Sequence, residues 1–145
     1  MLKYALLVAL AAIAIAAEPD PKVMSYTLPK DIKWTGTGGN RRAVLFGDEA
    51  KPGMYGVLVK WLPGNMSRPH THATARYITV IKGTWWLGWG DKYDPASTFG
   101  VHEGTVVTHY ANQVHYDGAK DEECIIEIVG MGPAESVQLN GGEKK

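Results

Sequence analysis

The chain has 145 residues, which is enough for one domain with a sizeable hydrophobic core but not for two. Its 15 basic and 15 acidic side chains cancel, and no basic stripe gathers along the sequence, so a general attraction to nucleic acid is excluded. The single cysteine, Cys124, cannot form an internal disulfide, and its apolar neighbours predict a buried, unreactive thiol.

The first 17 residues are typical of a secretory signal peptide. Lys3 precedes an apolar run over residues 5–15, and small alanine side chains come just before Glu18. The run is short for a membrane span, which needs about 20 residues, so cleavage is favoured over a retained anchor. We therefore predict that residues 1–17 are removed, which leaves a periplasmic or secreted protein without a membrane attachment.

The rest of the chain is expected to comprise an N-terminal arm over residues 18–35, a barrel over 36–133 and a C-terminal tail over 134–145. Within the barrel, β-branched and aromatic runs recur about every 8 to 12 residues between glycine, proline, asparagine and aspartate. No segment keeps an apolar period of about 3.6 residues over several turns, so the fold class is all-β, a sandwich or barrel in one piece. The expected strands lie at residues 41–47, 54–62, 75–83, 84–90, 104–110 and 123–131.

Two of these runs, residues 54–62 and 123–131, are apolar on both faces. One face would fill the barrel, and the other would pack on a second sheet or on a partner subunit. A homodimer is therefore expected.

Three histidines suggest a metal site. His70 and His72 are separated by one residue, so on a strand they project to the same face. The same parity continues to Arg76, which is therefore predicted to face the same interior. His115 follows a strand and a tight turn, from which it could return to the same cavity. Three neutral imidazoles suit a divalent transition metal such as Fe, Mn, Zn, Cu or Ni and leave coordination positions open.

Two segments resemble the paired motifs of the cupin superfamily, G(X)5HXH(X)3–4E(X)6G and G(X)5PXG(X)2H(X)3N. The first motif is matched by Gly64, His70, His72 and Gly83, and Arg76 stands in place of its glutamate. The second motif is matched by Gly104 and His115. In that motif, Tyr110 stands in place of the proline, Asn112 in place of the glycine and Ala119 in place of the asparagine. The chain is similar to small secreted bacterial single-domain cupins. The resemblance implies a conical β-barrel, also called a double-stranded β-helix or jelly roll, with a metal in its mouth held by the three histidines.

The main departure from the motif is Arg76, because the glutamate is normally the fourth ligand. An arginine about 6 Å from a divalent ion costs roughly 5 kcal/mol at an effective dielectric of about 20. Three outcomes are open: Arg76 turns away to a carboxylate such as Glu127 or to bulk water, it stays and clamps an anionic substrate over the metal, or the metal site is lost. The change at Asn112 is milder, since asparagine tolerates the left-handed turn that glycine usually provides.

Further candidates lie near the histidines in the sequence. Tyr55, Tyr77, Tyr110 and Tyr116 are possible proton donors, and Tyr110 is singled out with Arg76 as a catalytic candidate because it precedes His115 closely. His109 could be a fourth ligand or support one, or it could simply pack within its strand.

Two classes of function follow. The first is a metal-dependent enzyme that acts on a small, possibly anionic, organic molecule; oxygenases, isomerases and lyases all occur among cupins, so the fold does not choose a reaction. The second is a non-catalytic periplasmic protein whose degenerate site binds a ligand or a metal.

Overall fold

The computed structural model describes residues 18–139. The predicted signal peptide, 1–17, and the end of the predicted tail, 140–145, lie outside the described residues. The chain divides into two compact units, 1–31 and 32–145. The described part of the first unit is irregular apart from a turn and the short 3-10 helix η1 (Pro29–Asp31). Between residues 18 and 139, no helix is long and apolar enough to cross a membrane.

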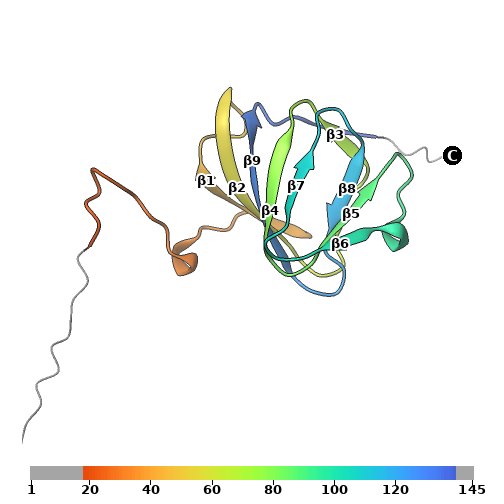
Figure 1. Cartoon of the computed structure of the whole chain (residues 1–145), viewed down its shortest axis with the longest axis horizontal. Helices are drawn as coiled ribbons and strands as arrows, with labels where there is room; N and C mark the ends of the chain where they lie inside the picture. Colours follow the sequence, from red (N-terminus) through yellow and green to blue (C-terminus); the bar gives the residue numbers. More distant parts are fainter. Residues whose placement is uncertain (1–17, 140–145) are drawn as a thin grey trace, which may run out of the picture. The chain divides into compact units, whose positions relative to one another are not determined.

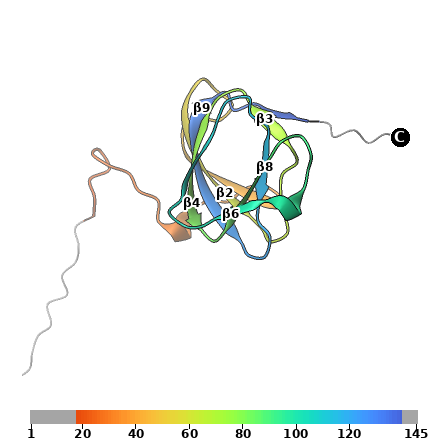
Figure 2. The same ribbon diagram turned by 45° about the vertical axis from the view of Figure 1, so that its right-hand side comes forward.

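Two antiparallel sheets of five strands each make up the second unit (Figure 1). The first sheet has the strand order β1-β2-β9-β4-β7, and the second has the order β10-β3-β8-β5-β6. The strands are β1 (Asn40–Phe46), β2 (Gly53–Trp61), β3 (His70–His72), β4 (Arg76–Lys82), β5 (Trp85–Trp89), β6 (Phe99–Val101), β7 (Val106–His109), β8 (His115–Gly118), β9 (Cys124–Gly132) and β10 (Ser136–Gln138). In Figure 2 the strands of both sheets surround a common interior. The predicted all-β fold is confirmed.

The first sheet supplies most of the core: β4 and β9 alternate between buried and more exposed side chains, and β2 is buried continuously over residues 55–59. Antiparallel pairing aligns the inward side chains of β2, β9 and β4 in rows across the sheet. Two buried apolar rows are Val57, Ile128 and Ile78 in one and Val59, Ile126 and Val80 in the next. Burial of each such side chain contributes about 1.5–3 kcal/mol to folding. We call these six residues the apolar rows.

A different row lies at one end of the same strands. Gly130 of β9 is aligned with Tyr55 of β2 on one side and with Arg76 of β4 on the other, and Arg76 is aligned in turn with His109 of β7. We call these four residues the polar row. The inward face of the sheet thus changes from aliphatic side chains to polar ones at this end of the strands.

The second sheet is built from shorter strands and carries the histidines. Strand β3 pairs with the central strand β8 through His70 and His115, and with the edge strand β10 on its other side. The sheet therefore extends beyond the predicted barrel range of 36–133, since β10 lies in the segment predicted as a tail. Its three exposed residues gave no apolar pattern from which a strand could be predicted.

The motif glycines occupy turns that require their conformational freedom. Gly64, Gly83 and Gly104 have φ values of 76°, 75° and 81°, in the left-handed region that side chains with a Cβ rarely adopt. Asn112 has a φ of 59°, so the expectation that it accepts the left-handed turn is confirmed. Its N–H donates to the carbonyl of His72 at 2.8 Å, which ties the turn before β8 to β3.

Candidate metal centre

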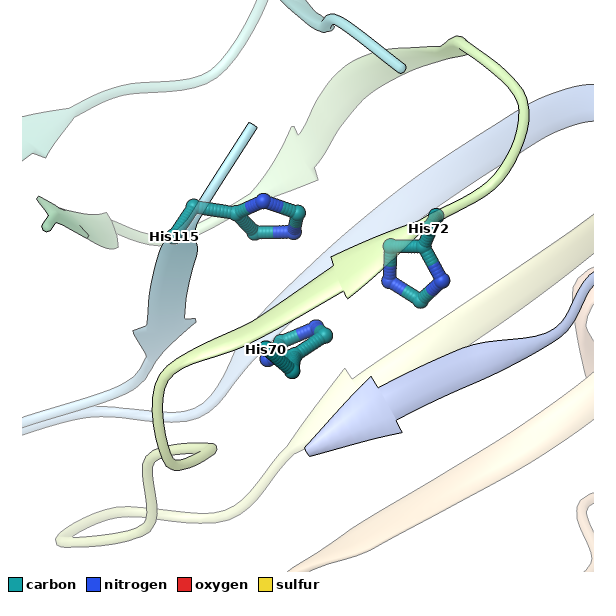
Figure 3. Close-up of side chains that lie close together, drawn as sticks. All are labelled: His70, His72 and His115. Atoms are coloured by element: carbon teal, nitrogen blue, oxygen red, sulfur yellow. The ribbon is translucent and has the colours of Figure 1, made fainter. Parts of the chain in front are cut away.

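His70, His72 and His115 come together inside the barrel (Figure 3). All three side chains are buried, and one ligand nitrogen from each lies within 4.8 Å of the others. The ring centroids are 4.5 Å apart for His70 and His115, 4.8 Å for His70 and His72, and 5.4 Å for His72 and His115. The two residues of β3 share a face as predicted, and the pairing of β8 with β3 brings the third beside them.

The backbone fixes which nitrogen each ring presents. The Nδ1 atom of each ring lies at hydrogen-bond distance from a backbone carbonyl: 2.7 Å to Arg68 for His70, 2.9 Å to Glu135 for His72 and 3.0 Å to Gln113 for His115. A carbonyl can only accept, so Nδ1 carries the proton and Nε2 keeps its lone pair. The Nε2 atoms of His72 and His115 are buried and have no hydrogen-bond partner. Such outer partners are typical of metal-binding histidines, and the residues fit a metal ion.

The environment also keeps the rings of His72 and His115 neutral. Burial, reinforced by the positive charge of Arg76, lowers the pKa of His72 to about 3. Burial likewise lowers the pKa of His115. Neutral imidazoles are the form that binds metal, so the lone pairs stay available at neutral pH.

His109 lies beside this group but is not part of it. Its ring centroid is 3.9 Å from that of His115 and 5.3 Å from that of Trp85. With His115 and Asp117 it forms a second set of possible ligands within 4.8 Å of one another. Its Nδ1 atom is buried and unpartnered, and burial, followed by the nearby histidine and arginine charges, lowers its pKa to about 2. If His109 only packed within its strand, the burial of its Nδ1 atom without a hydrogen-bond partner would have no explanation.

Arg76 stays inside the barrel. Its side chain is 8% exposed and lines the same cavity as His70 and His72, so the predicted direction is confirmed. The suggestion that it could turn to Glu127 is wrong, because Glu127 lies between the inward residues Ile126 and Ile128 and points to the other face of β9. Among the described residues, Arg76 forms no ion pair, and its Nε atom is buried without a partner.

The tyrosine singled out from the sequence does not reach this site. Tyr110 is 70% exposed and does not line the cavity, because it follows the end of β7 in an exposed turn. Tyr55, by contrast, is fully buried in the polar row; its hydroxyl forms no hydrogen bond of standard geometry, but it lies close enough to the Arg76 guanidinium to interact with it. Burial raises the pKa of Tyr55, partly offset by the positive charge of Arg76, so the phenol stays protonated.

The cavity lined by His70, His72, Arg76 and His109 has a volume of about 410 Å³, large enough for a small organic molecule. Its wall combines apolar side chains such as Ile78, Ile128 and Trp85 with polar ones. Asp117 is a buried lining residue that was not predicted, and it accepts a hydrogen bond from Trp85 Nε1 at 3.2 Å. Asp117 lies two residues after His115 and therefore on the same face of β8. This spacing could have been used to predict Asp117 as a site residue from the sequence.

No family model matches the chain, and a search of curated proteins finds no match either. Solved structures do resemble it. The polyketide cyclase RemF from Streptomyces resistomycificus is 18% identical, with a TM-score of 0.67 over 83% of this chain and 88% of that one. A cupin-2 domain from Rhodospirillum rubrum is 17% identical, with a TM-score of 0.61 over 81% of each chain. The DMSP lyase DddQ from Ruegeria pomeroyi is 16% identical, with a TM-score of 0.61 over 77% of this chain and 64% of that one. The chain therefore has the cupin fold, a jelly roll of two facing antiparallel sheets, as predicted.

Proposed function

We propose that this protein is a metal-dependent enzyme in which His70, His72 and His115 hold a divalent transition metal and the cavity binds a small organic substrate. The observation that carries the proposal is the arrangement of the three rings. Each Nδ1 is bonded to the backbone, so the lone pairs of Nε2 are free where the rings converge. Fe, Mn, Zn, Cu and Ni all accept such ligands.

The described residues also suggest how a substrate would be bound. Three histidines leave coordination positions open, and a metal there would supply a Lewis acid or a site for dioxygen. Arg76 offers a positive charge, which favours an anionic substrate. Asp117 is the buried carboxylate of the cavity and could hold a proton-bearing group of the substrate. The wall formed by Ile78, Ile128 and Trp85 would exclude water around it.

Similar structures support an enzymatic role on small molecules, since a polyketide cyclase and a DMSP lyase share this fold. Their reactions differ from each other, so neither is transferred to this chain. The non-catalytic alternative shares the same metal and ligand site and differs only in the absence of turnover.

Two further properties are part of the proposal. We expect the mature protein to act in the periplasm or outside the cell, on the basis of the predicted signal peptide. We also expect a homodimer, because the outer face of the first sheet exposes large apolar side chains. These are Phe46, Met54, Tyr77, Ile81, Val106 and Met131.

Metal content tests the proposed centre. The mature chain, purified without a histidine tag, is incubated with each of the five metals, desalted and measured by mass spectrometry. We expect about one ion per chain for the preferred metal, and loss of that ion in His72→Ala. His102→Ala is the matched control, because His102 lies in an exposed loop away from the three rings. Trace metal in the wild type, or full retention in His72→Ala, would contradict the proposal.

A further inference from the structure

The interior of the barrel contains a positive charge that no described residue neutralises directly. Arg76 is 8% exposed, and among residues 18–139 it has no carboxylate partner. Neither carboxylate that lines the cavity forms an ion pair with Arg76, although the negative charge of Asp117 acts on it from a longer distance. Glu49 forms an ion pair with Arg42, and Asp117 accepts the indole N–H of Trp85. Because an unpaired buried charge is costly, the site is suited to a negatively charged ligand.

The neighbours of Arg76 in the polar row restrict where its guanidinium can lie. Gly130 separates Arg76 from Tyr55 on adjacent strands. A Cβ atom at Gly130 would lie 2.8 Å from the Tyr55 hydroxyl, so only glycine leaves room for that hydroxyl over β9. Tyr55 does not line the cavity, whereas Arg76 does. The phenol therefore lies behind the arginine and limits its movement away from the cavity.

The charge of Arg76 is directed toward the histidines. It lines the cavity with His70, His72 and His109, and its positive charge contributes to the lowered pKa values of His72 and His109. An anion between Arg76 and the histidines would face a cation on one side and neutral lone pairs on the other. A metal on those lone pairs would increase the attraction.

We propose that Arg76, positioned by Tyr55 in the space left by Gly130, forms a carboxylate-binding subsite in the wall of the cavity, and that the ligand of this protein is a small carboxylic acid. This inference rests on the proposed function in one respect: the other end of the ligand would reach the proposed metal. The subsite itself requires only Arg76 and its two neighbours. Tyr55 and Gly130 are positioning residues in this account.

The number of donors favours a carboxylate over a phosphate. A planar guanidinium matches the two oxygens of a carboxylate with two parallel hydrogen bonds. A phosphate exposes more oxygens and carries more charge, and it would need several donors. Arg42, the other arginine that lines the cavity, is already paired with Glu49. The nearby wall is aliphatic, with Ile78 and Ile128, which suits the hydrocarbon part of an organic acid.

The test is a titration of the full mature chain, ¹⁵N-labelled, in metal-free and zinc-loaded forms, followed through the Nε–H resonances of its arginines. The probes are acetate, its neutral isostere acetamide, and inorganic phosphate. We expect acetate to shift one arginine resonance in both forms, and we expect acetamide to leave it in place. That resonance is assigned to Arg76 by its absence in Arg76→Lys, which keeps the charge but loses the forked donors. Acetate affinity should fall at least about tenfold in that variant.

Two variants test the positioning residues. Tyr55→Phe and Gly130→Ala leave Arg76 and the histidines in the chain, and each should weaken acetate binding by roughly threefold to tenfold with zinc content unchanged. Tyr77→Phe is the matched control, because Tyr77 follows Arg76 on β4 but points outward and is 58% exposed. Acetate binding in this control should equal that of the wild type. Wild-type binding in both Tyr55→Phe and Gly130→Ala would overturn their positioning role.

The outcomes separate the subsite from the metal centre. Normal zinc loading with no effect of acetate would overturn the subsite and leave the metal centre supported. Acetate binding in a protein that takes up no metal would support the subsite and contradict the metal centre. Phosphate binding as tight as acetate binding, or an equal response to acetamide, would overturn the assignment to a carboxylate.

Discussion

The apolar rows and the polar row share strands β2, β9 and β4, and the polar row continues to His109 of β7, yet the two differ in burial of polar atoms. In the apolar rows, Val57, Ile128 and Ile78 are buried against one another and leave no polar group to satisfy. One level further along, Tyr55 and Arg76 are equally buried but have a hydroxyl and an Nε atom without hydrogen-bond partners. The apolar rows stabilise the barrel, and the polar row supplies Arg76 and His109 to the wall of its cavity.

The difference teaches that, within the first sheet, stability and binding are separated along the strands. A barrel of this size can accommodate unsatisfied polar groups at one level because the aliphatic levels beside it supply the burial energy. Substitutions in the apolar rows should therefore affect stability more than the polar groups of the site, although Ile78 and Ile128 also line the cavity. Substitutions in the polar row should do the reverse.

The largest effect on stability is expected from Ile78→Ala. The side chain is fully buried in the apolar rows, so its removal loses transfer free energy and leaves a cavity. We expect the free energy of unfolding to fall by about 2–5 kcal/mol, measured by urea unfolding of the metal-free protein. Ile81→Ala, on the same strand but 48% exposed, should change it by about 0.5 kcal/mol or less. Equal losses in the two variants would break the distinction between buried and exposed faces of β4.

A second effect concerns pH, because two histidines, His109 of the polar row and His72 of β3, are kept neutral by burial. The pKa is about 3 for His72 and about 2 for His109 in the folded protein, against about 6.5 in the unfolded chain. Below pH 6.5 the unfolded chain therefore binds protons that the folded protein does not. The free energy of unfolding should fall between about pH 6.5 and pH 5, by up to roughly 1.4 kcal/mol per pH unit for each histidine.

This dependence is measured by urea unfolding of the metal-free protein at pH 7, 6 and 5. The window lies above the usual pKa values of carboxyl groups, which limits their contribution. In His109→Gln, the free energy of unfolding should fall less steeply as the pH is lowered, by up to roughly 1.4 kcal/mol per pH unit. His102 lies in an exposed loop, so His102→Gln should leave the pH dependence unchanged. Stability that is constant across this range would show that the histidines are not buried in neutral form.

The smallest effect is expected from Tyr55→Phe. Its hydroxyl is fully buried without a partner, so its removal relieves a desolvation penalty while the ring remains. We expect the free energy of unfolding to rise by about 1 kcal/mol, measured by thermal and urea unfolding, although acetate binding weakens. A loss of stability of similar size would show that the hydroxyl is satisfied in the folded protein, which would remove one difference between the two levels.

Much of the fold could be predicted because its longest strands carry strong patterns. The runs that became β2 and β9 are rich in aliphatic residues, and the turns between strands carry glycine. The spacing of the two motifs also brought His70, His72 and His115 into one group without any structure. The short strands β6 and β10 could not be predicted, since three residues contain too little periodicity.

The surroundings of the histidines were less accessible to sequence reasoning. Tyr110 was favoured over Tyr55 because it is close to His115 in the chain, but closeness in sequence says little about strands that pair across a sheet. The neighbour of Arg76 in space is Tyr55, some 21 positions earlier, and only the register of β2, β9 and β4 brings them together. Register depends on pairing between distant segments, which a single sequence does not specify.

The central claim is that three imidazoles bind one metal ion, and X-ray absorption spectroscopy of the zinc-loaded mature chain tests it most directly. The account predicts nitrogen or oxygen ligands at about 2.0–2.1 Å and multiple scattering from about three imidazole rings. His72→Ala should reduce the imidazole signal, and His102→Ala should leave it unchanged. A spectrum without imidazole scattering, or one that is identical in wild type and His72→Ala, would contradict the claim.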